Sequence, residues 1–223
     1  MGDQHLNDLL RWSIENSASA PDGTTTTDAA APHTALNPEA LAALMGGPSD
    51  ADLMRASLEA AASADPAVDL ETRLVALDNL EQLIESLDNA NLLARLGLWT
   101  PLLGCLARDE PEVRRMAAWC VGTAVQNNEP CQERLVALGG VERLVRMVMT
   151  EKETPKVRRK AMYALSSAVR NYQPAMNACA AELRRLGRGA LVGGEDAVVD
   201  AQDMDAVDAV INALRAEVTS ASE

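Results

Sequence analysis

Residues 113–130 read VRRMAAWCVGTAVQNNEP, and 44 positions further on residues 157–174 read VRRKAMYALSSAVRNYQP. A third and more divergent copy, LETRLVALDNLEQLIESL, occupies residues 70–87 and aligns with the first of these at an offset of 41. Ten positions are identical or similar in the two closest copies: Val113/Val157, Arg114/Arg158, Arg115/Arg159, Ala117/Ala161, Trp119/Tyr163, Val121/Leu165, Ala124/Ala168, Val125/Val169, Asn127/Asn171 and Pro130/Pro174. A period of this length indicates a protein built of stacked repeats.

Each copy has the spacing of an amphipathic helix. One side carries small and aliphatic residues: Val113, Ala117, Cys120, Val121 and Ala124 in one copy, and Val157, Ala161, Ala164, Leu165 and Ala168 in the other. The opposite side carries Arg115, Trp119, Gly122 and Gln126 in one copy, and Arg159, Tyr163, Ser166 and Arg170 in the other. We therefore predict a core-facing stripe and, opposite it, an aromatic residue flanked by cations. That aromatic is either covered by a neighbouring helix or is a contact residue for a partner.

Shorter apolar segments separate the long ones. Residues 91–107 match residues 133–149, and in both a Leu-Gly pair, at 96–97 and 138–139, predicts the end of a helix. Polar turns follow at Asp109-Glu110-Pro111 and Glu153-Thr154-Pro155. Each unit thus contains two short helices and one long helix. This pattern predicts an all-α, armadillo-like helical solenoid over residues 68–186.

The flanking segments differ from the repeats. Residues 1–36 are rich in Thr, Ala and Pro, which is typical of a flexible segment, and residues 37–67 predict short helices that begin at Asn37-Pro38. After Leu186 four glycines interrupt the pattern, so the repeats are expected to end there. Residues 187–223 then form an acidic C-terminal tail, in which the weakly amphipathic stretch 204–218 is expected to cap the last repeat.

The composition favours stacked helices with an aliphatic core. Hydrophobic residues make up 48% of the 223 residues, yet aromatic residues make up only 2% and Phe is absent. The net charge is −13, but residues 71–185 hold fourteen acids and sixteen bases. Such a balance argues against a nucleic-acid partner. Because neither a signal peptide nor a membrane span is present, we expect a cytoplasmic protein with no membrane partner. We also expect a monomer.

The sequence contains no pattern typical of catalysis or of cofactor and metal binding. Both histidines, His5 and His33, lie in the segment expected to be flexible, and no phosphate-binding or zinc-binding motif occurs. The cysteines lack Cys-x-x-Cys spacing, which favours a reducing compartment: Cys105, Cys120, Cys131 and Cys179. We therefore expect a binding protein without a cofactor, and not an enzyme.

Several separate motifs resemble one family, in the order in which that family carries them. These are LLRWSIENS (9–17), VDLETRLVALDNLEQLIESLDNAN (68–91), AAWCVGTAVQNN (117–128) and YALSSAVRNYQP (163–174). Together they look like the fungal cytosolic nucleotide-exchange factors of the Fes/HspBP armadillo family, which serve heat-shock protein 70 chaperones. One departure is that longer relatives continue with further repeats, whereas here recognisable repeats end near Leu186.

The resemblance implies that the armadillo domain grips the chaperone's ATPase domain, so that ADP leaves and the client is released. It also implies that the N-terminal segment occupies the chaperone's peptide-binding site, a role that suits Leu9, Leu10, Trp12 and Ile14. By family match the expected chaperone contacts are Asn89, Ala90 and Asn91. By helical phase they are Arg115, Trp119, Arg159 and Tyr163. Fungal relatives have also been linked to translation.

An alternative from a different class is an armadillo adaptor that holds an extended peptide or cargo in its groove, as nuclear-import proteins do. Such adaptors carry a regular ladder of Trp and Asn. In this chain the Asn positions are occupied by Thr123 and Ser167, and the first copy has Asp78 where Trp is expected. These differences count against the adaptor.

Overall fold

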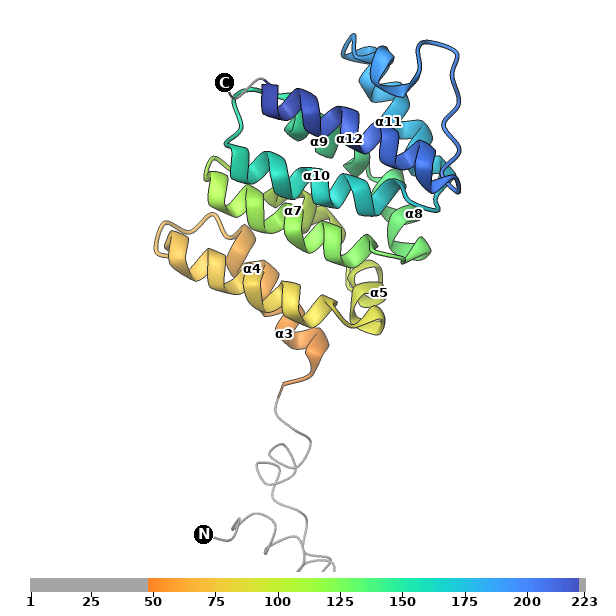
Figure 1. The fold of residues 1–223 in the computed structure, drawn as a ribbon. Helices are drawn as coiled ribbons and strands as arrows, with labels where there is room; N and C mark the ends of the chain where they lie inside the picture. The colour runs from red at the N-terminus through yellow and green to blue at the C-terminus, as the bar shows by residue number, and fades with distance from the viewer. Residues whose placement is uncertain (1–47, 221–223) are drawn as a thin grey trace, which may run out of the picture. The chain divides into compact units, whose positions relative to one another are not determined.

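The computed structural model describes residues 48–220, and Figure 1 shows that they form a stack of helices. This range contains ten α-helices, one short 3-10 helix and no strand, which confirms the all-α prediction. The helices are α3 (Asp50–Ala62), α4 (Leu70–Ile84), α5 (Leu87–Arg95), α6 (Trp99–Cys105), α7 (Pro111–Val125), α8 (Glu129–Ala137), α9 (Gly140–Met149), α10 (Pro155–Val169), α11 (Gln173–Arg185), η1 (Gly189–Val192) and α12 (Met204–Ser220). The expectations for residues 1–36 and for the start of the 37–67 segment lie outside the described residues.

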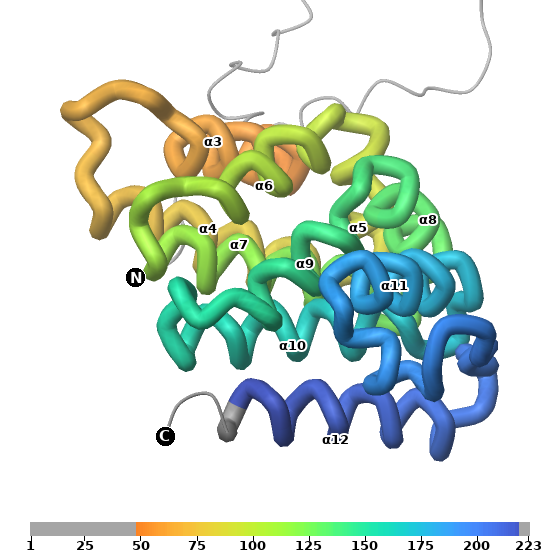
Figure 2. Tube along the Cα trace, turned by 90° about the horizontal axis from the view of Figure 1, so that it is seen from above, coloured from red at the N-terminus to blue at the C-terminus, as the bar shows by residue number. Residues whose placement is uncertain are grey.

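The long helices form one layer. In Figure 1, α4, α7, α10 and α12 lie side by side across the front of the molecule, and Figure 2 shows α12 running along α10. The shorter helices α3, α6, α9 and α11 pack behind them. Two complete three-helix units are present, α5–α6–α7 and α8–α9–α10, and α3 with α4 stands in for the end of an earlier unit. This is the arrangement predicted from the repeats.

The predicted core stripe is buried in both copies. Val113, Ala117 and Cys120 of α7, like Ala161 and Leu165 of α10, have no exposed surface. Burial also extends beyond the stripe, to Met116 and Ala118 among others, because α7 is enclosed by α4 on one side and α10 on the other. Interior repeats of a solenoid therefore bury more than one face.

The Leu-Gly pairs end helices as predicted. Gly97 has a φ of +69°, and the next amide, that of Leu98, donates to Leu93 O at 2.8 Å, which is the hydrogen bond of a Schellman motif. Gly139 has a φ of +67° at the equivalent place. Gly187 ends α11 in the same way, with a φ of +72° and a bond from Arg188 N to Leu183 O at 2.8 Å.

Helical structure continues beyond Leu186, after the last recognisable sequence repeat. After α11 the 3-10 helix η1 takes the place of a second short helix, and α12 takes the place of a long one. Val207, Ile211 and Leu214 of α12 are fully buried, and the helix packs on α10 and α9. The glycines near 187 thus separate α11 from η1, and residues 204–218 lie within α12.

An arginine in the first turn of α4, α7 and α10 ties each of these helices to the segment that precedes it. Arg73, Arg114 and Arg158 occupy equivalent repeat positions, and each donates to carbonyl oxygens of the loop or helix end before it. Arg114 also makes a two-point ion pair with Glu153, with both N–O distances at 2.7 Å. These side chains satisfy carbonyls that helix ends leave unpaired.

Candidate partner-binding face

The face formed by the long helices carries a shallow pocket of about 400 Å³ lined largely by aromatic, acidic and amide side chains. We call this the aromatic surface. Its lining residues are Glu81 of α4, Glu85 at the end of α4, Trp119 and Thr123 of α7, Gln126 and Asn127 at the end of α7, and Tyr163 of α10. Both aromatic rings are half-buried, so each packs on the protein and still offers area to a partner.

Trp119 and Tyr163 are held by contacts between α7 and α10. The ammonium of Lys160 lies 3.2 Å from the centroid of the Trp119 ring and 5.5 Å from that of Tyr163, so it makes a cation–π contact with the first. Burial lowers the pKa of Lys160, and the nearby positive charge of Arg115 acts in the same direction, while Glu81 opposes the shift. The helical periodicity of the sequence predicted arginines beside the aromatic residues. It did not identify Lys160, because Lys160 lies on α10 and the ring that it contacts, Trp119, lies on α7.

Tyr163 is positioned by the residues opposite it on α7. Its hydroxyl donates to Gln126 Oε1 at 3.1 Å, and its ring lies against Gly122. Gly122 was expected to face outward with Trp119, yet it is buried because Tyr163 covers it. Tyr163 is therefore partly covered by the neighbouring helix α7 and partly available to a partner.

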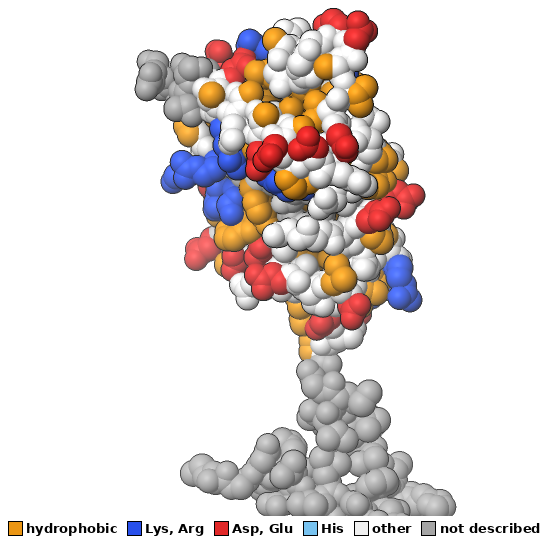
Figure 3. Space-filling model, turned by 45° about the vertical axis from the view of Figure 1, so that its right-hand side comes forward, with side chains coloured by type: hydrophobic (Ala, Val, Ile, Leu, Met, Phe, Trp, Pro, Cys, Tyr) orange, Lys and Arg blue, Asp and Glu red, His pale blue; other side chains and the backbone are white. Residues whose placement is uncertain are grey.

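The charge on this face changes sign from α4 to α10. Glu81 and Glu85 lie at the α4 side, and Glu81 accepts a hydrogen bond from Thr123 Oγ1 at 2.7 Å. Arg115 of α7 and Arg159 of α10 each precede the aromatic residue of the same helix by four positions, which is about one helical turn. In Figure 3 this face is turned to the left, where Lys and Arg side chains lie above Asp and Glu side chains. Such a gradient orients a partner that carries complementary charge.

Asn89 and Ala90, which the family match predicts as chaperone contacts, are buried in the structure. Asn89 is 8% exposed and its amide donates to Leu83 O and to Asp50 Oδ2, while Ala90 is 2% exposed. The backbone oxygen of Ala90 lies 3.4 Å from Cys131 Sγ of α8. Both residues therefore hold α5 against its neighbours, and Asn91 is the one member of the trio that is half-exposed. A large side chain at residue 90 would disturb the α5–α8 packing before it affected any partner.

The remaining predictions concern the cysteines, metal binding and membrane-spanning helices, and they are compared here with the described residues. All four cysteines are free and buried, and burial raises the pKa of the Cys131 and Cys179 thiols to about 12. Within residues 48–220 no group of three or more potential metal-binding side chains occurs. No helix in the same range is both long and apolar enough to cross a bilayer.

Comparison with known proteins places the chain among nucleotide exchange factors. The family model described as nucleotide exchange factor Fes1 matches residues 6–93, and that of the SIL1/FES1/HPBP1 C-terminal domain matches residues 89–181. The Hsp70 nucleotide exchange factor FES1 of Gibberella zeae is 56% identical over 222 residues, which cover 99% of this chain and 100% of that one. The FES1 protein of Saccharomyces cerevisiae is 45% identical over 134 residues, which cover 59% of this chain and 43% of that one.

The Gibberella relative is thus matched along its whole length. Among solved structures, a designed armadillo repeat protein in complex with the peptide (KR)4 superposes with a TM-score of 0.52 and 17% identity, over 78% of this chain and 70% of that one. At that identity the likeness shows the armadillo fold alone. The two family models and the relative matched along its whole length together show that this chain belongs to the Fes1 family of nucleotide exchange factors.

Proposed function

We propose that this protein is a nucleotide exchange factor for a heat-shock protein 70 chaperone, and that it binds the chaperone's ATPase domain, speeds ADP release and promotes client release. The observation that carries the proposal is the whole-length match to a relative named as an Hsp70 nucleotide exchange factor, at 56% identity. Its location is cytoplasmic, which agrees with four free, buried cysteines in the described part of the chain.

The activity needs no bond to be made or broken by this protein. A partner that binds the open form of the ATPase domain more tightly than the closed form shifts the chaperone toward the open form. Each tenfold shift requires about 1.4 kcal/mol of differential binding. By linkage, ADP must weaken the complex by the same factor by which the complex weakens ADP.

The aromatic surface and its two arginines are the contact site in this proposal. Trp119 and Tyr163 are half-buried aromatics on two rigid helices, and Arg159 is exposed. Among residues 48–220, neither Arg115 nor Arg159 has a hydrogen-bond or ion-pair partner, so both side chains are available to an acidic contact. Aromatic and Arg side chains of this kind dominate interface energies.

The test follows the release of a fluorescent ADP from the chaperone after addition of excess ATP. The variant Arg115→Glu/Arg159→Glu is expected to lower the stimulated rate about tenfold, with an unchanged circular dichroism spectrum. Trp119→Ala/Tyr163→Ala is expected to do the same, although its stability must be measured as well. The matched control is Arg95→Glu/Arg134→Glu, which makes the same charge change at exposed residues of α5 and α8 and is expected to stay within about twofold. A wild-type protein that left the ADP release rate unchanged at saturation would overturn the proposal.

The adaptor alternative has weaker support. The Thr123 hydroxyl, at the position where an adaptor presents Asn to a peptide backbone, already donates to Glu81 within the protein. A pull-down from lysate separates the two functions, since an exchange factor retains one chaperone and loses it on addition of ATP, whereas an adaptor retains assorted basic cargo.

A further inference from the structure

The pocket of the aromatic surface combines two carboxylates with two aromatic rings. Glu81 and Glu85 are four positions apart at the end of α4, which is about one helical turn, and both line the pocket. Trp119 and Tyr163 supply the rings. No Lys or Arg is found among the described residues that line it. The pocket therefore presents negative charge and aromatic faces, and its lining supplies no cation of its own.

Glu81 is a largely desolvated carboxylate in the wall of this pocket. It is 6% exposed, and one of its oxygens accepts the hydrogen bond from Thr123 Oγ1 at 2.7 Å. Within residues 48–220 its other oxygen accepts no hydrogen bond and forms no ion pair. A buried carboxylate with a single donor is costly unless a positive charge compensates it. Glu85 adds a second, exposed carboxylate at the rim of the pocket.

The Trp119 ring already attracts a cation from within the protein. The ammonium of Lys160 lies 3.2 Å from the ring centroid. Burial lowers the pKa of Lys160, and the nearby carboxylate of Glu81 opposes that shift, so the two charges attract each other. However, Lys160 comes from α10 and does not line the pocket. It offsets part of the charge of Glu81 and leaves the space beside Glu85 open.

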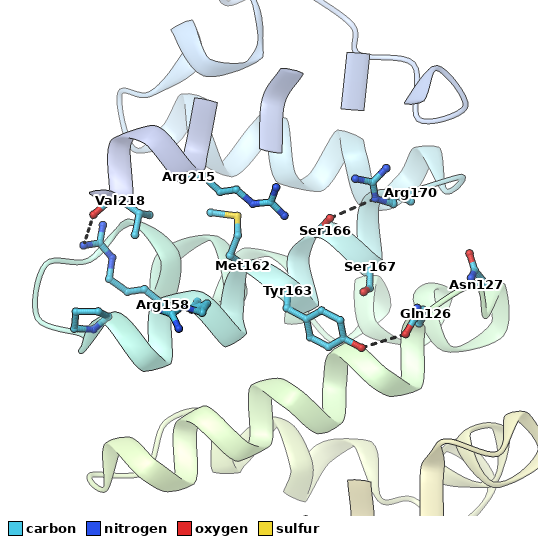
Figure 4. Close-up of a pocket in the computed structure, with 12 residues that line it drawn as sticks. Gln126, Asn127, Arg158, Met162, Tyr163, Ser166, Ser167, Arg170, Arg215 and Val218 are labelled. Carbon is cyan, nitrogen blue, oxygen red and sulfur yellow. Dashed lines mark hydrogen bonds between the residues drawn. The ribbon is translucent and has the colours of Figure 1, made fainter. Parts of the chain in front are cut away.

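The hollow on the other side of Tyr163 differs in charge. It lies between α10 and α12 and has a volume of about 720 Å³, and Figure 4 shows Tyr163 bonded to Gln126 in its wall. Its described lining includes arginines and no Asp or Glu. A cationic group is therefore attracted to the α4 side of Tyr163, where the carboxylates lie, and not to the α12 side.

These features fit the side chain of a lysine or an arginine. Both residues carry an apolar stem, which packs on aromatic rings, and a charged head, which reaches a carboxylate beyond them. A small inorganic cation would leave the rings uncovered, and an acidic side chain would be repelled. We propose that the aromatic surface receives one Lys or Arg side chain from the surface of the chaperone, with its stem on the two rings and its head at the two carboxylates. This inference rests on the proposed function and adds the chemistry that the partner must present.

The experiment measures the affinity of the full chain for the nucleotide-free chaperone by biolayer interferometry. The test variant Glu81→Gln/Glu85→Gln removes both charges and keeps an acceptor for the Thr123 hydroxyl. The matched control Glu59→Gln/Glu133→Gln removes two charges from exposed residues of α3 and α8 that do not line the pocket. The control is expected to bind within about twofold of wild type, and the test variant about tenfold more weakly. Circular dichroism checks that each variant is folded.

A charge-reversal search then identifies the partner's side chain. Glu85→Lys places a cation at the exposed rim of the pocket and is expected to weaken binding about tenfold. Each surface Lys and Arg of the chaperone's ATPase domain is replaced singly by Glu. One replacement should restore the binding of Glu85→Lys and weaken that of wild type. The residue replaced shows whether a lysine or an arginine enters the pocket.

Two results would overturn this inference and leave the exchange function standing. One is equal affinity of the folded test variant and its control, and the other is the lack of any chaperone substitution that restores the binding of Glu85→Lys. A wild-type protein that did not bind the chaperone would overturn both this inference and the proposed function.

Discussion

The ring of Tyr163 on α10 lies directly against Gly122 on α7. A Cβ atom added at residue 122 would come within 2.5 Å of Tyr163 Cε1 and 3.0 Å of the Cα atom of Ala164. Both distances are shorter than a normal contact between carbon atoms. The absence of a side chain at residue 122 is therefore what allows α7 and α10 to approach closely while Tyr163 reaches Gln126.

Gly122→Ala should consequently destabilise the protein, although Ala is the better helix former by about 1 kcal/mol. The added methyl group must displace Tyr163 or separate the two helices, and overpacking of this kind costs about 1 to 3 kcal/mol. Urea unfolding followed by circular dichroism measures the change. The matched control is Gly104→Ala in α6, where an added Cβ meets no atom within 4 Å and stability should hold or rise.

A double-mutant cycle separates this clash from a general effect of the substitution. If the Tyr163 ring is the obstacle, Gly122→Ala should cost less in a Tyr163→Ala background, with a coupling of about 0.5 to 3 kcal/mol. Equal or higher stability of Gly122→Ala in the wild-type background would show that α10 moves away without penalty.

The repeat pattern predicted most of the fold, because repeated core residues leave a regular trace. The stripe of Val113, Ala117 and Val121 and the helix ends at Gly97 and Gly139 all follow from spacing and local chemistry. The 3-10 helix η1 did not follow from the repeats, because the sequence after Leu186 no longer matches the repeat pattern. The Leu186-Gly187 pair was the available signal, since it repeats the helix end seen at Leu96-Gly97 and Leu138-Gly139.

The site was less predictable, because it consists of contacts between helices rather than along one. Helical phase identified Trp119 and Tyr163, but it gave no means of pairing Lys160 with Trp119 or Thr123 with Glu81 across 41 or 42 residues of sequence. The burial of Ala90 depends on α8, which a pattern within α5 does not reveal. Arg215 of α12 lines the pocket beside Met162 and Ser166 of α10 only because α12 lies along α10.

The stability of the α11 region should depend on pH through Glu182. This carboxylate is 4% exposed and accepts hydrogen bonds from Arg185 at 2.6 and 2.7 Å and from Arg146 at 2.6 Å. These bonds, with that from Arg185 first, lower the pKa of Glu182 from 4.5 to about 2. Because the folded-state pKa lies below the unfolded value, the stabilisation is complete above about pH 5 and is lost as the pH falls from 4.5 toward 2.

The variant Glu182→Gln should therefore be less stable than wild type at pH 7, and the difference should shrink as the pH is lowered below 4.5. Chemical unfolding at a series of pH values measures it. Glu59→Gln is the control, since Glu59 is an exposed carboxylate of α3 and its removal should have a small effect at every pH. A difference between wild type and Glu182→Gln that stayed constant from pH 7 to 3 would mean that Glu182 acts through shape rather than charge.

The last prediction concerns the N-terminal segment and separates two activities of one chain. Replacing Leu9, Leu10, Trp12 and Ile14 together by Ser keeps the length of the segment and its charge but removes its apolar side chains. If these residues compete with clients for the chaperone's peptide-binding site, the variant should release ADP at the wild-type rate, because that step needs only the helical domain. It should also leave a labelled client peptide bound to the chaperone for longer, because nothing then prevents its rebinding. Both rates are measured on the same mixture, and deletion of residues 1–36 should reproduce the pattern. A parallel fall in both rates would instead make the segment part of the grip on the ATPase domain.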